Sequence, residues 1–385
     1  MPRDIVLLST ADWDNPFWTN KQHVAVELAR RGHRVLYIDS LGLRRPSAST
    51  RDIRRIARRV RKALRAPREV RKGLWVWSPF ALPFHGNPIG RGVTRGLLER
   101  GLDARLRSLG MRKEWLWTYN PMSSRLVDLA AFDRCIYHCV DEIGAQPGMP
   151  TATLRAAEED LTRRADVVFT TSRALTESRQ RWNPRTHYLP NVADFEHFYA
   201  AMSPETAIPD DLTQLPAPRL GFIGAISGYK VDFALIRAVA TARPDWNLVL
   251  IGSVGEGDPW TDIGALEGLT NVRLLGPRAY ATLPGYLKGF DVALLPNRIN
   301  DYTDAMFPMK LFEYLAAGLP VVSVDLKAIR EFSDVVDIAP SPDAFIAKIA
   351  AVLAGRTPAL SARLSVAKRH TYVTRMDRML ALIPA

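Results

Sequence analysis

Residues 4–40, DIVLLSTADWDNPFWTNKQHVAVELARRGHRVLYIDS, contain the pattern that first indicates the fold. The apolar run DIVLLST over 4–10 is typical of a buried strand, and VLYIDS over 35–40 is a second one. A helix is expected between them, over 21–35, and Gly32 suits the end of that helix. A strand, a helix and a strand at this spacing predict two parallel strands joined by a crossover helix.

Similar runs extend outward from this unit along the chain. In the first half, further strands are expected at LWVWSP (74–79), EWLWTYN (114–120), RCIYHCV (134–140), DVVFTTS (166–172) and THYLPN (186–191). The second half repeats the alternation, with strands expected at RLGFIG (219–224), NLVLIG (247–252), VRLLG (272–276), VALLP (292–296) and PVVSV (320–324). Two such series predict an α/β protein with two Rossmann-like, doubly wound domains that face a cleft.

A stretch rich in proline and polar residues separates the two series. Residues 194–219 contain SPETAIPDDLTQLPAPR and are the best candidate for a linker. We therefore expect a first domain over 1–195, a linker over 196–218 and a second domain over 219–362. The remaining residues, 363–385, are expected to form a C-terminal helix.

The composition of the 385 residues is that of a globular protein, with 47% hydrophobic and 24% charged residues, which excludes a disordered or coiled-coil chain. No apolar run approaches the ~18–20 residues of a membrane-spanning helix, and the first run is more typical of a strand than of a signal peptide. We therefore expect a cytoplasmic protein. Cys135 and Cys139 fall in one expected strand, where four residues span ~13 Å, so we expect buried thiols and no disulfide.

Most of the net charge of +12 is concentrated in one segment. Thirteen arginines and lysines lie within Arg44–Lys72, against only Asp52 and Glu69. Apolar residues recur there at helical spacing over 53–64, which predicts a basic amphipathic helix. Such a helix could attach to an anionic membrane surface, bind nucleic acid, or simply cover the fold. No interleaved aromatic residues or DNA-binding motif accompany the charge, so nucleic acid is not an expected partner.

The segment DAMFPMKLFEYLAAGLPVV, residues 304–322, is the most informative for function. A helix is expected from Pro308, which suits a first helical position, to Ala317, which precedes a capping glycine. The free N–H groups at its start would attract an anion. Lys310 and Glu313, three residues apart, share one face of this helix. The ammonium could hold a phosphate and the carboxylate a ribose, or the two could form a surface ion pair.

A second candidate loop is GFIGAISGYK, residues 221–230, which follows an expected strand. Gly224 and Gly228 would let the backbone approach a phosphate closely, and Lys230 would add positive charge. The alternative is an ordinary turn between a strand and a helix. The spacing does not match G-x-G-x-x-G, which disfavours a nicotinamide oxidoreductase, and the chain contains no P-loop motif.

Taken together, these segments resemble a known family. FPMKLFEYLAAGLPVVS, residues 307–323, resembles the donor-site signature of the GT-B-fold glycosyltransferases, in the family-4-like bacterial branch of exopolysaccharide and wall-polymer type. Other segments resemble that family in the same order: ELARRGHRVLYID, YHCVDEI, ADVVFTTSRAL, HYLPNVADFEHF, GFIGAISGYKVDFALI, RPDWNLVLIG and VRLLGPRAYATLPGYLKGFDVALLP. The resemblance implies that the first domain is the acceptor side and that the helix over 363–385 crosses back to it.

The resemblance also implies roles for residues of the second domain. Glu313 matches the glutamate that holds the donor ribose, and Lys310 matches a phosphate-binding lysine that would also act in catalysis. Lys230 lies near the family's pyrophosphate lysine, Arg278 lies where the backbone meets the nucleobase, and Arg298 could reach the phosphate or the sugar. The expected donor-binding residues are Gly224, Ser227, Lys230, Arg278, Arg298, Met309, Lys310 and Glu313.

In the first domain, the resemblance implies a catalytic role for Asp141, which follows an expected strand. As a general base it would take the proton of the acceptor hydroxyl, and the alternative is that it caps or orients its loop. Asn20 and His23, near the start of the first helix, match the acceptor side of the family.

The sequence departs from the family pattern at two places. Ala305 stands where the family has the first glutamate of its glutamate pair, with Asp304 offset from it by one residue. Ala225 and Ile226 stand where an arginine is usual. The donor sugar and the stereochemical outcome are therefore left open.

The expected reaction moves a sugar from a nucleoside diphosphate, with a UDP-sugar the favoured donor, to a hydroxyl of a glycan, glycolipid or small molecule. No cofactor or metal ion is expected, because fixed cations would oppose the charge of the leaving diphosphate. Polysaccharide or glycolipid assembly at the inner face of the membrane is the favoured setting. A tailoring transferase with a soluble natural-product acceptor, a nucleotide-sugar epimerase and an inactive sugar-binding protein are the alternatives.

Overall fold

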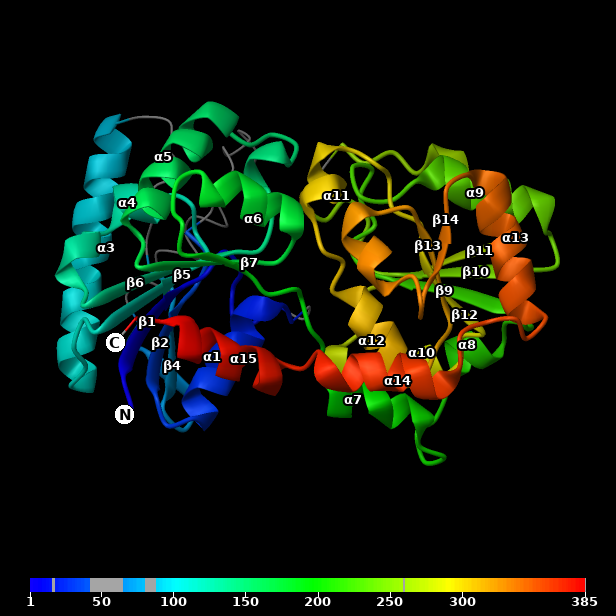
Figure 1. Ribbon diagram of the computed structural model, residues 1–385, viewed down its shortest axis with the longest axis horizontal. Helices are drawn as coiled ribbons and strands as arrows, with labels where there is room; N and C mark the ends of the chain where they lie inside the picture. Colours follow the sequence, from blue (N-terminus) through cyan, green and yellow to red (C-terminus); the bar gives the residue numbers. More distant parts are fainter. Residues whose placement is uncertain (16–17, 42–64, 80–87, 259, 385) are drawn as a thin grey trace. The chain divides into compact units, whose positions relative to one another are not determined.

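The computed structural model divides the chain into two compact units (Figure 1). The first unit is Met1–Leu189 with Met376–Ala385, and the second is Pro190–Arg375. The residues that the structure describes are 1–15, 18–41, 65–79, 88–258 and 260–384. The predicted basic segment Arg44–Lys72 lies outside them up to Leu64, and so does every apolar position of its predicted helix.

An eight-stranded sheet forms the centre of the first unit, in the order β3-β4-β2-β1-β5-β6-β7-β8. The strands are β1 Asp4–Leu8, β2 Arg34–Ile38, β3 Arg68–Arg71, β4 Leu74–Trp77, β5 Trp115–Thr118, β6 Arg134–Cys139, β7 Val167–Thr170 and β8 Thr186–Tyr188. All neighbouring strands are parallel except β3 and β4. Strand β1 is buried along its whole length, as its continuous apolar run predicts for a parallel strand covered on both faces.

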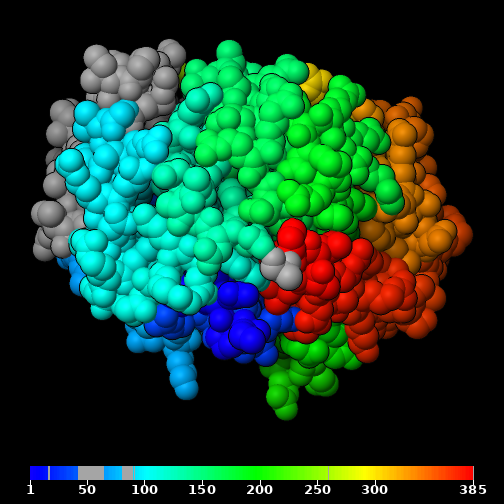
Figure 2. Space-filling model, turned by 60° about the vertical axis from the view of Figure 1, so that its left-hand side comes forward, coloured from blue at the N-terminus to red at the C-terminus, as the bar shows by residue number. Residues whose placement is uncertain are grey.

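Helices from both ends of the chain pack on this sheet. Their bounds are α1 Asn20–Arg30, α3 Pro88–Leu109, α4 Ser123–Leu126, α5 Thr151–Arg164, α6 Arg173–Gln180 and α15 Tyr372–Leu382. Helix α1 contributes Val24 and Leu28 to the core. Helix α15 contributes Met376 and Met379 to the same core, and Ile383, just after the helix, joins them. Figure 2 shows the C-terminal segment, in red, beside the N-terminal residues, in blue.

The described end of the basic segment Arg44–Lys72 forms a strand. Strand β3 runs antiparallel to β4 at the edge of the sheet, with Arg68 opposite Val76. Arg68, Glu69 and Arg71 are exposed. Charged side chains on an edge strand disfavour its pairing with another chain. The predicted helix itself, over 53–64, lies outside the described residues.

The second unit is built on a six-stranded parallel sheet in the order β11-β10-β9-β12-β13-β14. Its strands are β9 Arg219–Ile223, β10 Asn247–Ile251, β11 Val272–Gly276, β12 Val292–Leu295, β13 Val321–Val324 and β14 Asp337–Ala339. Its helices are α7 Phe195–Tyr199, α8 Asp210–Thr213, α9 Phe233–Ala242, α10 Leu283–Lys288, α11 Asp301–Ala305, α12 Lys310–Ala316, α13 Pro342–Leu353 and α14 Leu360–Arg369. Two parallel-sheet units of this kind confirm the predicted α/β fold class.

Residues 196–218, predicted as a linker, are packed into the second unit. Phe198, Ala201 and Leu212 are buried in its hydrophobic core together with side chains of α12. These apolar residues, spaced among the prolines, outweigh the polar composition that suggested a linker. The division between the units falls instead between β8 and α7, and again within α15.

The strand orders locate the point where each sheet can bind a ligand. In the first unit the chain moves outward from β1 through β2 and then crosses to β5 on the other side of β1. In the second it moves from β9 through β10 to β11 and then crosses to β12. Open parallel sheets bind ligands beyond the carboxyl ends of their strands at such a reversal. The loops after β1 and β5, and those after β9 and β12, are therefore the candidate sites.

Candidate functional site

In the second unit, the loops after β9 and β12 are held together by backbone and side-chain hydrogen bonds. The carbonyl of Lys230 accepts from the backbone N–H of Arg298 at 2.9 Å and from Nδ2 of Asn297 at 3.2 Å. Nη1 of Arg298 donates to the carbonyl of Gly228 at 3.2 Å. Two predicted donor-binding cations, Lys230 and Arg298, therefore lie on two loops that are hydrogen-bonded to each other at the reversal point of the sheet.

Two tyrosine rings position the ammonium of Lys230. Its Nζ lies 5.3 Å from the ring centre of Tyr229 and 5.5 Å from that of Tyr302 on α11. The two rings are 4.9 Å apart and nearly perpendicular, at 70°. Aromatic faces attract a cation at this range, so the rings restrict where the charge can lie.

Gly224 and Ser227 shape the same loop. The N–H of Gly224 donates to the carbonyl of Ile251 at 2.9 Å, and a Cβ at Gly252 would lie only 1.8 Å from the carbonyl oxygen of Gly224. The hydroxyl of Ser227 is fully buried and donates to the carbonyl of Glu256. The side chain of Ser227 therefore holds the loop after β9 to the loop after β10.

Helix α12 is shorter than predicted. It runs from Lys310 to Ala316, with Met309 as its half-buried N-cap, and the N–H of Leu311 bonds to the carbonyl of Pro308 at 3.2 Å. This tight first turn places Pro308 before the helix. The predicted end is confirmed, because Gly318 adopts a φ of 78° just after the C-cap.

The side chains of α12 tie it to the carboxyl end of β9. The hydroxyl of Tyr314 accepts from the backbone N–H of Ile223 at 2.8 Å. In the same turn, Nζ of Lys310 donates to the carboxylate of Glu313 at 2.7 Å, where Glu313 is buried and Lys310 is partly exposed. The structure therefore contains the ion pair between Lys310 and Glu313 that the sequence left open as an alternative. The pair lies near the carboxyl ends of the strands, where the candidate site is.

Arg278 has a structural partner. Its guanidinium donates to the hydroxyl of Tyr286 and to the carboxylate of Asp211 on α8, each at 2.6 Å. Burial acts to raise the pKa of Asp211, but the hydrogen bonds from Arg278 and Tyr286 outweigh it and lower that pKa. The side chain of Arg278 thus fastens α8 to the loop after β11. The predicted contact with the nucleotide-sugar donor would then be made by the backbone of Arg278.

The departure at Ala305 is visible in the structure. Ala305 is buried at the end of α11, and the neighbouring Asp304 forms an ion pair with Lys327 at 2.5 Å. The carboxylate of Asp304 therefore has a cationic partner in Lys327.

The residues predicted to lie on the acceptor side, in the first unit, are in an aromatic environment after β1. Asn20 and His23 are buried at the start of α1. The ring of His23 is 5.2 Å from that of Trp18, which is itself 5.4 Å from the ring of Trp13. The hydroxyl of Tyr119, after β5, reaches the carbonyl of Asn20 at 3.4 Å. The structure thus brings Asn20 and His23 to the reversal point of the first sheet.

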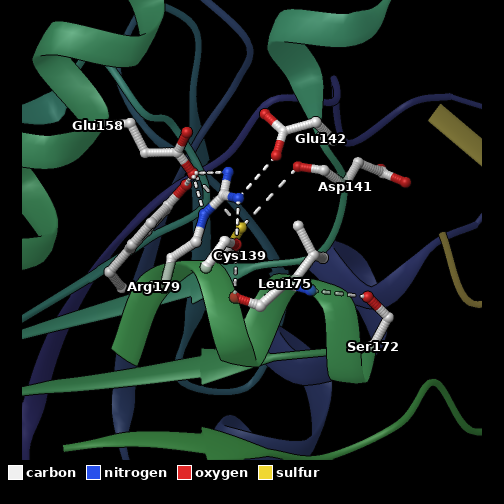
Figure 3. A network of polar contacts seen from close by, with 9 residues as sticks. Cys139, Asp141, Glu142, Glu158, Ser172, Leu175 and Arg179 are labelled. Carbon is white, nitrogen blue, oxygen red and sulfur yellow. Dashed lines mark hydrogen bonds and ion pairs between the residues drawn. The ribbon is translucent and has the colours of Figure 1, made fainter. Parts of the chain in front are cut away.

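Asp141 follows β6 directly, next to a buried ionic network (Figure 3). Arg179 on α6 pairs with Glu142 at 2.6 Å and with Glu158 at 2.7 Å, and Glu158 also accepts from the hydroxyl of Tyr137 at 2.6 Å. Arg179 is only 3% exposed. The loop that carries Asp141 is therefore fixed through its neighbour Glu142 by a guanidinium from α6.

The cysteines beside this network are free and buried, as predicted. Burial raises the pKa of Cys135 to about 12 and also raises the pKa of Cys139. Within the described part of the chain, no three His, Cys, Asp or Glu side chains lie together as metal ligands would.

Comparison with known proteins relates the second unit to a family and the whole chain to a fold. Residues 217–355 match the model of the group 1 glycosyl transferases. TuaH of Bacillus subtilis (strain 168), named as a teichuronic acid biosynthesis glycosyltransferase, is 32% identical over 230 residues. That match covers 55% of this chain and 55% of TuaH, so the chain spans about half the length of the curated relative it matches.

Two solved structures superpose on nearly the whole chain. Sucrose-phosphate synthase of Thermosynechococcus elongatus gives a TM-score of 0.69 at 16% identity, over 99% of this chain and 98% of that one. HepE of Anabaena, solved in complex with UDP-glucose, gives 0.66 at 14% identity over 98% of each chain. The chain has the GT-B fold.

The family match within this GT-B chain falls on the second unit. It contains all eight predicted donor-binding residues, whereas Asn20, His23 and Asp141 lie outside it. Sequence reasoning missed Asn297 and Tyr302, the residues that fasten and frame Lys230. A polar residue directly after a strand was the available signal for Asn297. Among the residues that the structure describes, no helix of this GT-B chain has both the length and the apolar character needed to cross a membrane.

Proposed function

We propose that this protein is a glycosyltransferase that moves a sugar from a UDP-sugar to a hydroxyl of a cell-surface glycan or glycolipid. The observation that carries the proposal is the pair of cations, Lys230 and Arg298, at the β9/β12 reversal point. A backbone hydrogen bond joins the two residues, and the guanidinium of Arg298 also donates to the carbonyl of Gly228. The group 1 family match over 217–355 supports the reaction type. The UDP-glucose complex of HepE supports the donor, and the name of TuaH supports a wall-polymer setting.

The chemistry follows from where the negative charge develops. Cleavage of the anomeric C–O bond leaves a diphosphate, and donors fixed beside it stabilise that charge without reorganising. Lys230 and Arg298 are fixed cations, each worth about 1.5–3 kcal/mol in a charge-assisted hydrogen bond. Lys310 would exchange Glu313 for a phosphate oxygen, which frees the Glu313 carboxylate to accept the ribose hydroxyls.

Asp141 is proposed as the general base that takes the proton of the acceptor hydroxyl. Its loop is held by the ion pair between Glu142 and Arg179. Asn20 and His23 would orient the acceptor at the reversal point of the first sheet. Exchange of Asp141 for asparagine should then abolish transfer and leave UDP affinity unchanged, and an active variant would rule out this role.

The proposed setting at the inner face of the membrane rests on the composition of Arg44–Lys72 and on the name of TuaH. A soluble acceptor is the second candidate. Vesicles containing anionic lipid separate the two, with a variant carrying Gln at Arg54, Arg55, Arg58, Arg59 and Arg61 as the control. Salt-sensitive binding by the parent chain alone supports the membrane setting.

The test of the whole proposal is a thermal-shift panel of UDP, GDP, ADP and TDP sugars, followed by nucleotide release with and without acceptor. A ligand that binds only the folded protein raises its Tm by mass action. UDP-sugars should raise the Tm of the parent chain and lose most of that effect in Lys230→Ala. Lys348→Ala, a surface change on α13, serves as the matched control. Conversion of the donor into a second nucleotide sugar, without acceptor and without net release of nucleotide, would indicate an epimerase. No response to any nucleotide would overturn the proposal.

A further inference from the structure

We propose that a separate cavity in the second unit, beside the Lys230 loop, binds a neutral pyranose. The inference rests on the proposed glycosyltransferase function and adds a carbohydrate subsite to it. The cavity of about 410 Å³ lies between the start of α9 and the loop after β10, with Gly228, Tyr229, Trp260 and Arg298 on its wall. Its volume is within the range of small-ligand pockets.

The wall of this cavity carries an unusually exposed tryptophan. Trp260 is 70% exposed, more than any other large apolar side chain in the described part of the chain except Met1. Water around an indole of this size is unfavourable, and burial of an aromatic side chain dominates the energetics of a binding site. A flat apolar ring open on a cavity therefore offers a face for the C–H side of a sugar ring.

Hydrogen bonds connect the backbone of Trp260 and the side chain of Thr261 to the rest of the cavity wall. Its backbone N–H donates to Oδ1 of Asp258 at 3.2 Å, and Oγ1 of Thr261 donates to Oδ2 of the same carboxylate at 3.0 Å. Asp258 is buried, and Thr261 in turn accepts from the backbone N–H of Gly228 at 3.1 Å. This chain of hydrogen bonds ties the backbone of Trp260, from which the indole projects, to the loop that carries Lys230.

The charges around the cavity select a neutral ligand. Three carboxylates, Asp232, Asp258 and Asp262, and one guanidinium, Arg298, line the cavity. This excess of negative charge repels phosphate and uronate groups, so the cavity favours a neutral ligand over an anionic one. Carboxylate oxygens accept hydrogen bonds from hydroxyl groups and the guanidinium donates them, so a polyhydroxylated neutral ring fits this set.

The pyranose could belong to an acceptor glycan or to the donor, because Gly228 and Arg298 border both the cavity and the Lys230 loop. Calorimetric titrations with chitotetraose, cellotetraose and tetragalacturonate test the first source, and titrations with UDP-glucose against UDP test the second. For at least one neutral probe, Trp260→Ala should weaken binding by about tenfold or more, and Trp260→Phe should retain it within about threefold. Tyr199→Ala, an exposed aromatic change on α7, should leave binding unchanged.

The preference of the cavity for neutral over anionic sugars can be tested separately. Tetragalacturonate should bind the parent chain more weakly than the neutral tetrasaccharides, and Asp262→Asn should narrow that difference by about threefold or more. UDP affinity should be the same in the parent chain and in Trp260→Ala. If UDP binds normally but no neutral probe responds to Trp260→Ala, the subsite is overturned and the proposed function stands. If UDP itself fails to bind, the proposed function is overturned instead.

Discussion

The ion pair of Lys310 and Glu313 shows how one side chain can have both a resting partner and a proposed ligand. In the free protein the ammonium lies 2.7 Å from the carboxylate, and that carboxylate is buried. A diphosphate brings more negative charge than a single carboxylate, so it can displace Glu313 from Lys310. Lys310 would therefore exchange Glu313 for a phosphate oxygen only when the donor is bound, and the donor site would be complete only then.

We expect Lys310→Ala to lower kcat/KM by about 10–100-fold, because it removes a charge-assisted contact to the leaving diphosphate. The measurement is steady-state kinetics with the donor varied, together with the affinity for UDP. Loss of the ammonium also leaves Glu313 buried without it, so the Tm of the variant must be recorded alongside.

Glu313→Gln provides the matched comparison, since it keeps the volume and removes the charge that Lys310 pairs with. Its effect should fall on donors with a ribose and spare the binding of inorganic pyrophosphate. A donor kcat/KM within twofold of the parent chain for Lys310→Ala, with an unchanged Tm, would contradict the phosphate role.

At the scale of elements, the network of Figure 3 fastens α5, α6 and the loop after β6 to one another. Arg179 of α6 bridges Glu158 of α5 and Glu142 of the loop. Removal of one partner from a buried ionic network leaves uncompensated charge and costs far more than removal of an exposed pair. The position of the loop with Asp141 therefore depends on a residue of another helix.

Arg179→Gln should lower the free energy of unfolding by about 3–5 kcal/mol, measured by urea denaturation. The control is Arg163→Gln, which removes an exposed pair with Glu159 on the surface of α5 and should cost at most about 1 kcal/mol. Equal losses in the two variants would show that the network adds no more than a surface pair.

The sequence predicted strands better than it predicted connections. Continuous apolar runs such as those of β1 and β9 leave no alternative to a buried parallel strand. The linker prediction over 196–218 failed because burial of Phe198 and Leu212 depends on a distant helix, which local composition does not report. Sequence reasoning likewise missed Asn297, because its role depends on a contact with Lys230, 67 residues away.

The candidate site was predictable to a similar extent. Lys230 and Arg298 follow strands, and parallel strands bring such positions to one edge, so their meeting is a consequence of topology. The partner of Arg278 was not predictable, because Asp211 lies in a segment whose packing the composition concealed. The sequence also left open whether Lys310 forms an ion pair with Glu313, and only the structure shows that it does.

At the scale of the whole molecule, the first unit is discontinuous in sequence. Its last contribution, Met376–Ala385, arrives after the complete second unit. Met379 is fully buried in the core of the first unit, and an exposed pair of Arg31 with Asp377 also ties α15 there. The C-terminal helix is therefore part of the first hydrophobic core and is more than a surface addition.

Met379→Ala should destabilise the first unit by about 2–5 kcal/mol and leave the second unit unaffected. Hydrogen exchange resolves the two, because amides of β1 and β2 should lose protection while those of β9 and β10 keep it. Leu382→Ala, at an exposed position of the same helix, is the control. Equal loss of protection in both sheets would show that the units unfold together.

The return of α15 also bears on how the protein is made. Translation delivers residues 190–375 as one uninterrupted block, so the second unit can fold as soon as it leaves the ribosome. The first unit, although begun earlier, must wait with an uncovered patch of its core until Met376, Met379 and Ile383 emerge. The first unit, whose synthesis begins first, is therefore the last to complete its hydrophobic core. A nascent chain stalled before residue 376 would expose the uncovered apolar surface of that core, to which chaperones bind.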